Sequence, residues 1–144
     1  MNDSGETLSA RRTAAHFLPP GGQRRLLVLA GRPKPVARAR EFTLSALVDW
    51  SWPDADDVVL LVAELVANAM LHAGGPLELV LDVSDTRLRI EVSDSSPALP
   101  APKEPHRPSQ PGGHGLYIVR QTSDRWGATP RPDGKTVWAE IDTR

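Results

Sequence analysis

The sequence contains no cysteine among its 144 residues. That absence excludes disulfide bonds, thiolate metal sites and cysteine nucleophiles, and it is consistent with the reducing cytoplasm in which we expect the protein to act. No apolar run approaches the roughly 20 residues that a membrane-spanning helix needs. The opening segment, MNDSGETLSARR, also lacks the apolar stretch of a secretory signal. We therefore expect no membrane partner.

The sequence also has no excess of either charge, because its 17 Lys and Arg residues nearly balance its 18 Asp and Glu residues. The arginines are scattered, so nucleic acid is not the expected partner. Hydrophobic residues make up 40% of the chain, and its length suits one domain with a core of its own. Lysine is rare, at positions 34, 103 and 135 only, and this bias toward arginine is typical of a GC-rich bacterial genome.

The chain divides into a tail and one domain. Residues 1–23 are polar and end in a Pro-Gly turn, which predicts a flexible N-terminal tail before a domain over residues 24–144. Prolines recur every two or three residues from 97 to 111, which predicts a mobile loop of a length that is often functional. The other expected elements are a strand over 24–30, a helix over 35–50, a hairpin of 77–83 and 88–93, a helix over 115–125 ended by Trp126 and Gly127, and a strand over 136–141.

A second helix, over residues 54–73, is apolar on almost every face, which predicts that it is covered on most sides. Asp54 at its start and Asp57 three residues later have the spacing of an N-cap arrangement. Glu64, Asn68 and His72 recur every four residues and share one face. Because burying such groups unpaired costs several kcal/mol, either the fold satisfies them internally or this face lines a polar cavity. The competing interpretation is that Glu64 and Asn68 lie at an exposed rim.

Three short polar motifs follow this helix. They are Asp94-Ser-Ser96 at the exit of the hairpin, Gly112-Gly-His-Gly-Leu116 before a helix, and Gly134-Lys-Thr136 at the last strand. The glycines can bring backbone N–H groups close to a phosphate at a helix N-terminus. They do not form a Rossmann fingerprint, because no strand leads into them, and the last motif is not a Walker A sequence, because it enters a strand.

Glu64 to Asn68 of the second helix and these three motifs, in this order, resemble four sequence boxes of the GHKL (histidine kinase-like) ATPase superfamily. These are the N box, the adenine-binding aspartate box, the glycine-rich lid box and the closing threonine. The single-domain bacterial anti-sigma factor kinases look most similar, and the resemblance covers residues 24–142. It implies an α/β two-layer sandwich, the Bergerat-type ATP-binding fold, with a mixed, mostly antiparallel sheet and helices on one face. The ATP lid would span residues 97–114.

The resemblance also implies roles for individual residues. Asp94 would accept the exocyclic amine of adenine, Asn68 would hold Mg²⁺ against the phosphates of ATP, and Glu64 would act as general base. For Asp94 alone, an Asx turn that ends a strand is the competing interpretation. A transition-metal site is disfavoured because asparagine is a poor ligand for such ions. The other residues expected at the nucleotide are Ser96, Gly112, Gly113, His114, Gly115, Leu116 and Thr136.

The function implied by the resemblance is that of an ATP-dependent serine/threonine protein kinase. It would phosphorylate an anti-sigma factor antagonist and sequester a sigma factor. Whether the protein forms a homodimer is left open by the sequence. The alternative is a non-catalytic regulatory module that binds adenine nucleotide and acts only through protein contacts. Leu71 occupies the position at which N boxes of the family often carry a basic residue. One phosphate contact that the resemblance implies is therefore not expected from this position.

Overall fold

The computed structural model describes residues 22–71, 75–96, 119 and 121–143. Its strands form one five-stranded sheet in the order β1-β2-β3-β5-β4, and every pair of neighbours is antiparallel. The elements are β1 (Gln23–Val28), α2 (Pro35–Asp49), α3 (Ala55–Met70), β2 (Pro76–Val83), β3 (Arg87–Asp94), β4 (Arg125–Arg131) and β5 (Gly134–Asp142).

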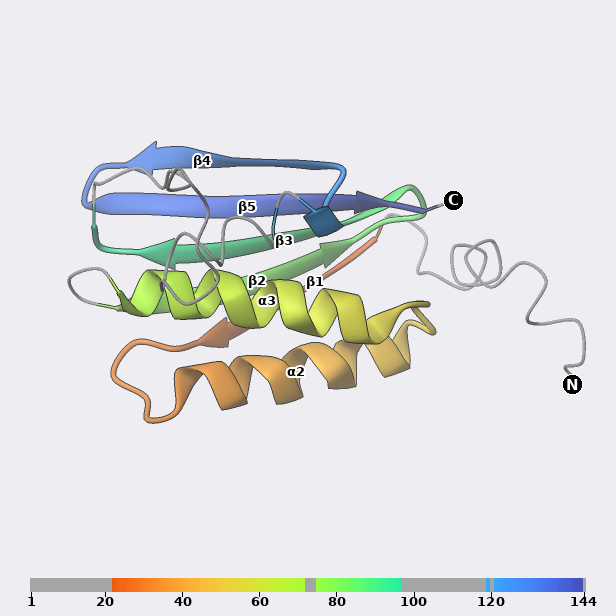
Figure 1. Cartoon of the computed structure of the whole chain (residues 1–144), viewed down its shortest axis with the longest axis horizontal. Coiled ribbons are helices and arrows are strands. Elements are labelled where there is room, and N and C mark those ends of the chain that lie inside the picture. The colour runs from red at the N-terminus through yellow and green to blue at the C-terminus, as the bar shows by residue number, and fades with distance from the viewer. Residues whose placement is uncertain (1–21, 72–74, 97–118, 120, 144) are drawn as a thin grey trace, which may run out of the picture.

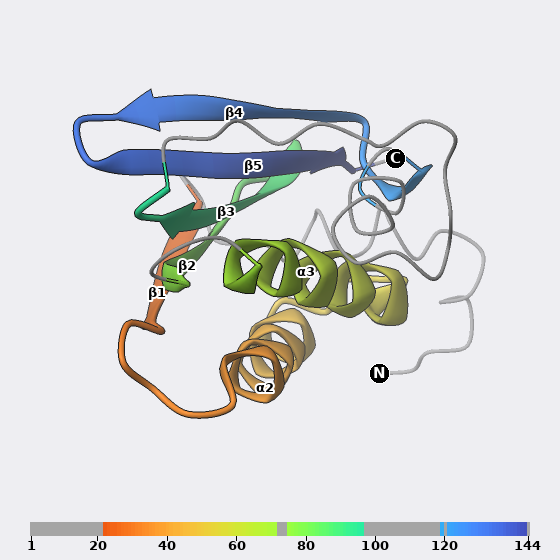
Figure 2. The same ribbon diagram turned by 60° about the vertical axis from the view of Figure 1, so that its left-hand side comes forward.

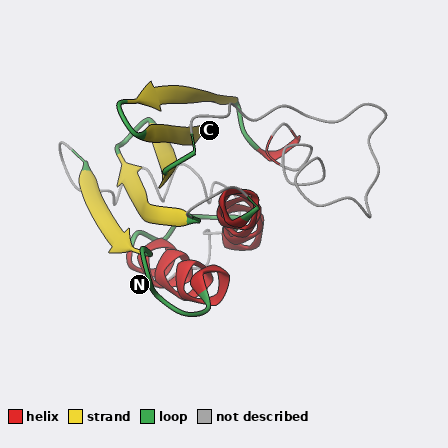
Figure 3. Cartoon of the chain, turned by 90° about the vertical axis from the view of Figure 1, so that its left-hand side faces the viewer, coloured by secondary structure: helices red, strands yellow, loops and turns green. Residues whose placement is uncertain are grey.

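The two helices lie side by side on one face of the sheet (Figures 1 and 3). This arrangement confirms the expected α/β two-layer sandwich with helices on one face. Strands β2 and β3 form the expected hairpin, and β1 takes the edge position. The expected mixed character of the sheet is absent from the described strands, which pair only antiparallel.

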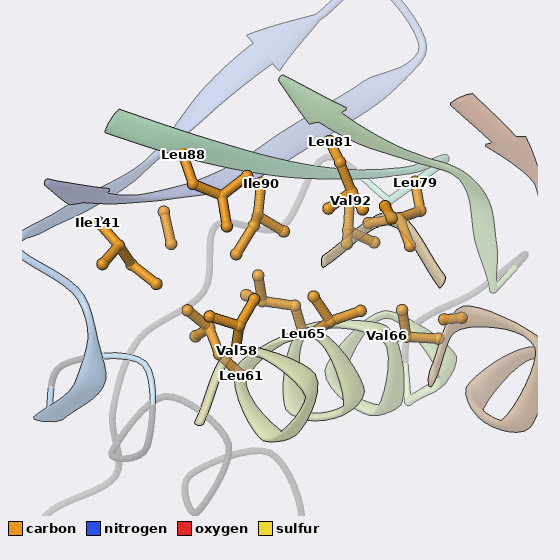
Figure 4. Packing of buried hydrophobic residues seen from close by; sticks show 14 of the residues in the cluster. Val58, Leu61, Leu65, Val66, Leu79, Leu81, Leu88, Ile90, Val92 and Ile141 are labelled. Atoms are coloured by element: carbon orange, nitrogen blue, oxygen red, sulfur yellow. The ribbon is translucent and has the colours of Figure 1, made fainter. Parts of the chain in front are cut away.

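The core lies between α3 and the middle of the sheet. Alternate residues of β2, β3 and β5 point at the helices, as the period of a strand requires. Figure 4 shows Leu61 and Leu65 of α3 facing Leu81, Ile90 and Val92 across this layer. All five are buried. Because burying one such side chain contributes about 1.5–3 kcal/mol, this layer fixes α3 against β3.

The ends of α3 differ from the expectation. Asp54 is the N-cap residue, but its backbone is left-handed (φ 56°) and its side chain makes no capping hydrogen bond. Its carbonyl oxygen instead accepts hydrogen bonds from the N–H groups of Asp57 at 3.1 Å and Val58 at 3.4 Å. The helix ends at Met70, before the expected Ala73, and residues 72–74 lie outside the described part.

Strand β4 corrects the prediction of a helix reaching Arg125. Helical conformation ends at Thr122, and Arg125–Arg131 pairs with β5. The segment contains Gly127 and Pro130, which disfavour a strand, and this is why it was missed. Pro130 is tolerated because β4 is an edge strand. A Cβ at Gly127 would lie 2.8 Å from the ring of Trp138, so a glycine is needed where the indole covers the strand.

None of the helices within the described residues combines the length and apolar character needed to cross a membrane.

Candidate nucleotide site

Three elements bring predicted site residues to one end of the molecule. The C-terminal half of α3, the end of β3 and the start of β5 lie together at this end in both Figure 1 and Figure 2. Helix α3 carries Glu64 and Asn68, β3 ends at Asp94, and β5 starts at Gly134. Residues that are far apart in the sequence therefore share one region.

The side chain of Asn68 belongs to the side of α3 that is mostly covered. Asn68 is only 6% exposed, beside the fully covered Leu65 and Ala69. Within the described residues, we find no hydrogen bond to its amide group. The amide is not fully enclosed, because the enclosed polar groups without a partner in the described part are those of Thr43 and Trp52. Water or a ligand can therefore reach the amide, and its oxygen suits a metal ion that keeps most of its own waters.

Glu64 lies one turn earlier on α3 and is half-buried. It lines a cavity of about 360 Å³ between α2 and α3, together with Val36, Arg40 and Leu60. Glu64 is thus open to solvent from the side of α2, while Asn68 lies deeper. The polar stripe expected on this helix is present at these two residues, and His72 lies outside the described part.

Asp94 is the last residue of β3 and is 2% exposed. Its Oδ1 accepts a hydrogen bond of 2.9 Å from the backbone N–H of Ser96. This is the Asx-type contact that sequence alone could not distinguish from a ligand role. The contact fixes the turn that leaves the strand, and it occupies only part of the carboxylate.

Lys135 is the residue that sequence reasoning missed. It is directly opposite Asp94 in the pairing of β3 with β5, so both side chains point to the helix face of the sheet. The Lys135 Nζ lies 3.0 Å from each carboxylate oxygen of Asp94 and 3.3 Å from the carbonyl oxygen of Ser96. The signal was available in the alternation of β5, because a strand that buries Val137 and Ala139 also turns Lys135 inward.

Thr136 lies on the opposite face of the sheet, so the structure does not bring its side chain together with Asp94. Its hydroxyl is 2.9 Å from that of Ser93, and Arg131 donates to both hydroxyl oxygens at 3.0 Å. The period of two along a strand explains the difference, because neighbouring residues of β5 face opposite sides. Lys135, and not Thr136, is the residue of β5 that lies beside Asp94.

The expected lid lies outside the described residues, and so do five of the expected nucleotide contacts. These are Gly112, Gly113, His114, Gly115 and Leu116. Ser96, the last described residue before this segment, is 7% exposed. Its backbone touches both Asp94 and Lys135, which ties the entrance of that segment to the ion pair.

A second charged cluster lies on the outer face of the sheet around Glu140 of β5. Arg125 and Arg89 donate to its two oxygens at 2.9 and 2.7 Å, and Arg87 lies 3.3 Å away. Burial by itself would raise the pKa of Glu140, but the hydrogen bonds from Arg125 and Arg89 outweigh it, so the pKa lies below its ordinary value. Hydrogen bonds to Asp142 and Glu140 raise the pKa of Arg125. With its cations satisfied by carboxylates, this cluster has a structural role.

Among the described residues, no three His, Asp or Glu side chains gather as metal ligands would. Magnesium in a nucleotide site does not need such a cluster, since it binds through one or two protein oxygens and the phosphates. The buried amide of Asn68 fits this requirement.

A comparison with protein families agrees with this geometry. The sequence model described as the histidine kinase-like ATPase domain matches residues 29–141, which include Glu64, Asn68, Asp94 and Lys135. A search of curated proteins finds no match.

Proposed function

Because the chain belongs to the histidine kinase-like ATPase family, whose domain binds ATP, we propose that it is a serine/threonine protein kinase of the anti-sigma factor type. Its substrate is an anti-sigma factor antagonist, and its other partner is a sigma factor that it sequesters. The observation that supports the proposal is that the C-terminal half of α3, which carries Glu64 and Asn68, and the end of β3, which carries Asp94, lie at one end of the sandwich (Figure 2).

Binding is divided between two side chains. Asp94 accepts the exocyclic amine of adenine, which favours adenine over guanine because a carbonyl group in that place would face a carboxylate. Asn68 holds Mg²⁺ through its amide oxygen. The ion supplies charge compensation for the phosphates when it is bound. The position of Asn68, on a mostly covered side chain whose amide has no hydrogen bond within the described residues, supports this role.

Glu64 is the proposed general base. The hydroxyl oxygen of a serine or threonine attacks the γ-phosphorus, the bond between that phosphorus and the β,γ-bridging oxygen breaks, and ADP leaves. The proton of the attacking hydroxyl passes to the Glu64 carboxylate. A half-buried carboxylate next to a cavity suits this task, because a protein substrate has to reach it.

The test is Glu64→Gln. The amide keeps the volume of the side chain, so ATP affinity measured by calorimetry should stay within several-fold. It cannot take the proton, so transfer of labelled phosphate to candidate antagonists should fall about 10²- to 10⁴-fold.

Asp56→Asn is the matched control, because Asp56 lies on the same helix and lines the same cavity. This variant should transfer phosphate at the wild-type rate. Equal rates for wild type and Glu64→Gln would remove Glu64 as the base. A wild-type protein that binds ATP but phosphorylates no antagonist would instead be the regulatory module.

A further inference from the structure

Lys135 and Asp94 form a buried ion pair that the expected nucleotide site does not account for. Their side chains are 0% and 1% exposed, so neither charge is compensated by solvent. A buried charge is tolerated only where its hydrogen-bonding capacity is used well. How each partner uses that capacity indicates what the pair does.

The lysine has no capacity left for a ligand. An ammonium group has three N–H donors. Those of Lys135 have three acceptors, the two oxygens of Asp94 at 3.0 Å and the carbonyl oxygen of Ser96 at 3.3 Å. Lys135 is therefore not free to bind a phosphate, and its contacts all act on Asp94 and on the turn that follows it.

The carboxylate does have capacity left, on one oxygen only. Each carboxylate oxygen accepts about two hydrogen bonds. Oδ1 of Asp94 already accepts from the N–H of Ser96 and from Lys135, whereas Oδ2 accepts, among the described residues, from Lys135 alone. The carboxylate held by Lys135 thus keeps one unused acceptor position, on Oδ2.

We propose that Lys135 is a positioning residue for base recognition, which holds Asp94 so that the remaining acceptor of Oδ2 meets the amine of the nucleobase. The inference rests on the proposed adenine-nucleotide site and deepens it. A purine with an amine at carbon 6 donates to this acceptor, whereas one with hydrogen there makes no hydrogen bond.

The backbone next to Lys135 supports this role. A Cβ at Gly134 would lie 2.0 Å from the carbonyl oxygen of Asp94. Only glycine allows β5 to start this close to the end of β3. The close approach fixes Lys135 opposite Asp94 independently of any side-chain packing.

The experiment compares ATP with purine riboside 5′-triphosphate, which lacks the 6-amine, by calorimetry with Mg²⁺. Wild type should prefer ATP. In Lys135→Met, which keeps the length of the side chain and removes its charge, ATP affinity should fall roughly 10- to 100-fold, the value of a charge-assisted hydrogen bond. Affinity for the analogue should change little, so the preference collapses. Arg87→Met, which removes an outward-facing cation from β3, should keep the wild-type preference.

If Lys135→Met does not fold, Lys135→Gln takes its place in the experiment. Its amide can still donate a hydrogen bond to Asp94, so its preference for ATP should be intermediate. An unchanged preference in a folded Lys135 variant, or an equal loss for both nucleotides, would overturn the positioning role and leave the proposed function intact. If wild type binds neither nucleotide, the proposed function fails, and the inference fails with it.

Discussion

Two carboxylates on neighbouring strands are both buried and both paired with cations, yet they differ in what surrounds the pair. Asp94 of β3 faces the helices and meets one lysine that is fully covered. Glu140 of β5 lies on the outer face and meets three arginines that are 29–50% exposed. The burial of the cation, and not of the acid, is therefore what separates the two sites.

This difference has an energetic consequence. If a charge is lost at Glu140, its arginines can turn toward water, because solvent already reaches them. If a charge is lost at Asp94, Lys135 stays enclosed with an uncompensated ammonium group. The outer cluster can thus be changed at low cost, while the inner pair couples the stability of the fold to the proposed base-recognition site.

The largest effect is expected for Asp94→Asn. The amide leaves the Lys135 ammonium buried without a charge partner, and breaking a buried pair from one side costs about 3–5 kcal/mol. Urea unfolding should show this loss. Any ATP measurement on this variant needs a stability measurement beside it, because a folding defect would imitate a binding defect.

The double variant Asp94→Asn with Lys135→Met separates the two causes. Removing both charges should recover most of the lost stability, since an uncharged pair needs no compensation. ATP affinity should stay low, because the acceptor for adenine is still missing. A single variant that unfolds at the wild-type urea concentration would show that the pair is not enclosed in solution.

The second-largest loss of stability is expected for Gly134→Ala. Its Cβ would lie 2.0 Å from the carbonyl oxygen of Asp94 and 2.8 Å from the Cα of Ser95, and backbone atoms cannot move aside as a side-chain end can. We expect a loss of about 1–3 kcal/mol, as for other overpacked positions. ATP affinity should fall as well, because the strand ends that hold Asp94 and Lys135 are forced apart.

Gly31→Ala is the matched control. Gly31 has a positive φ of 71° and no atom within 4 Å of its Cβ position. Alanine there is strained but meets no neighbour, so stability should fall by about 1–2 kcal/mol while ATP affinity stays unchanged. Equal ATP affinities for the Gly134 and Gly31 variants would contradict the close approach as a feature of the site.

The same comparison shows how far sequence could lead. Alternation and helical periodicity predicted the strand β3 and the helix α3, because Val92 and Leu65 belong to apolar patterns that the core buries. The two-layer fold was implied by the resemblance to the GHKL superfamily. Strand β4 was not predictable in this way. Its Gly127 is explained by the ring of Trp138, a contact between separate strands that no local pattern contains.

The candidate site was predictable where it depended on one element. The helical spacing placed Glu64 and Asn68, and the strand end placed Asp94. The alternation of β5 indicates that Lys135 points inward, but the sequence does not reveal which residue of β3 lies opposite it. That pairing depends on the register between two strands that are far apart in the sequence.

The smallest effect is expected for Glu140→Gln, and it depends on pH. The pKa of Glu140 lies below its ordinary value of 4.5, so the carboxylate stabilises the fold above that pH, and the contribution is lost as pH falls through the lowered pKa.

The Glu140→Gln variant should lose about 1–2 kcal/mol of stability at neutral pH, a value reduced by the exposure of the arginines. Urea unfolding of both proteins between pH 7 and 3 should show their difference shrinking below about pH 4.5. Asp82→Asn, which removes a carboxylate that pairs with the exposed Arg24 at 3.2 Å, should cost less than Glu140→Gln at neutral pH. A Glu140 deficit that is constant across this range would mean that the cluster acts through packing and not through charge.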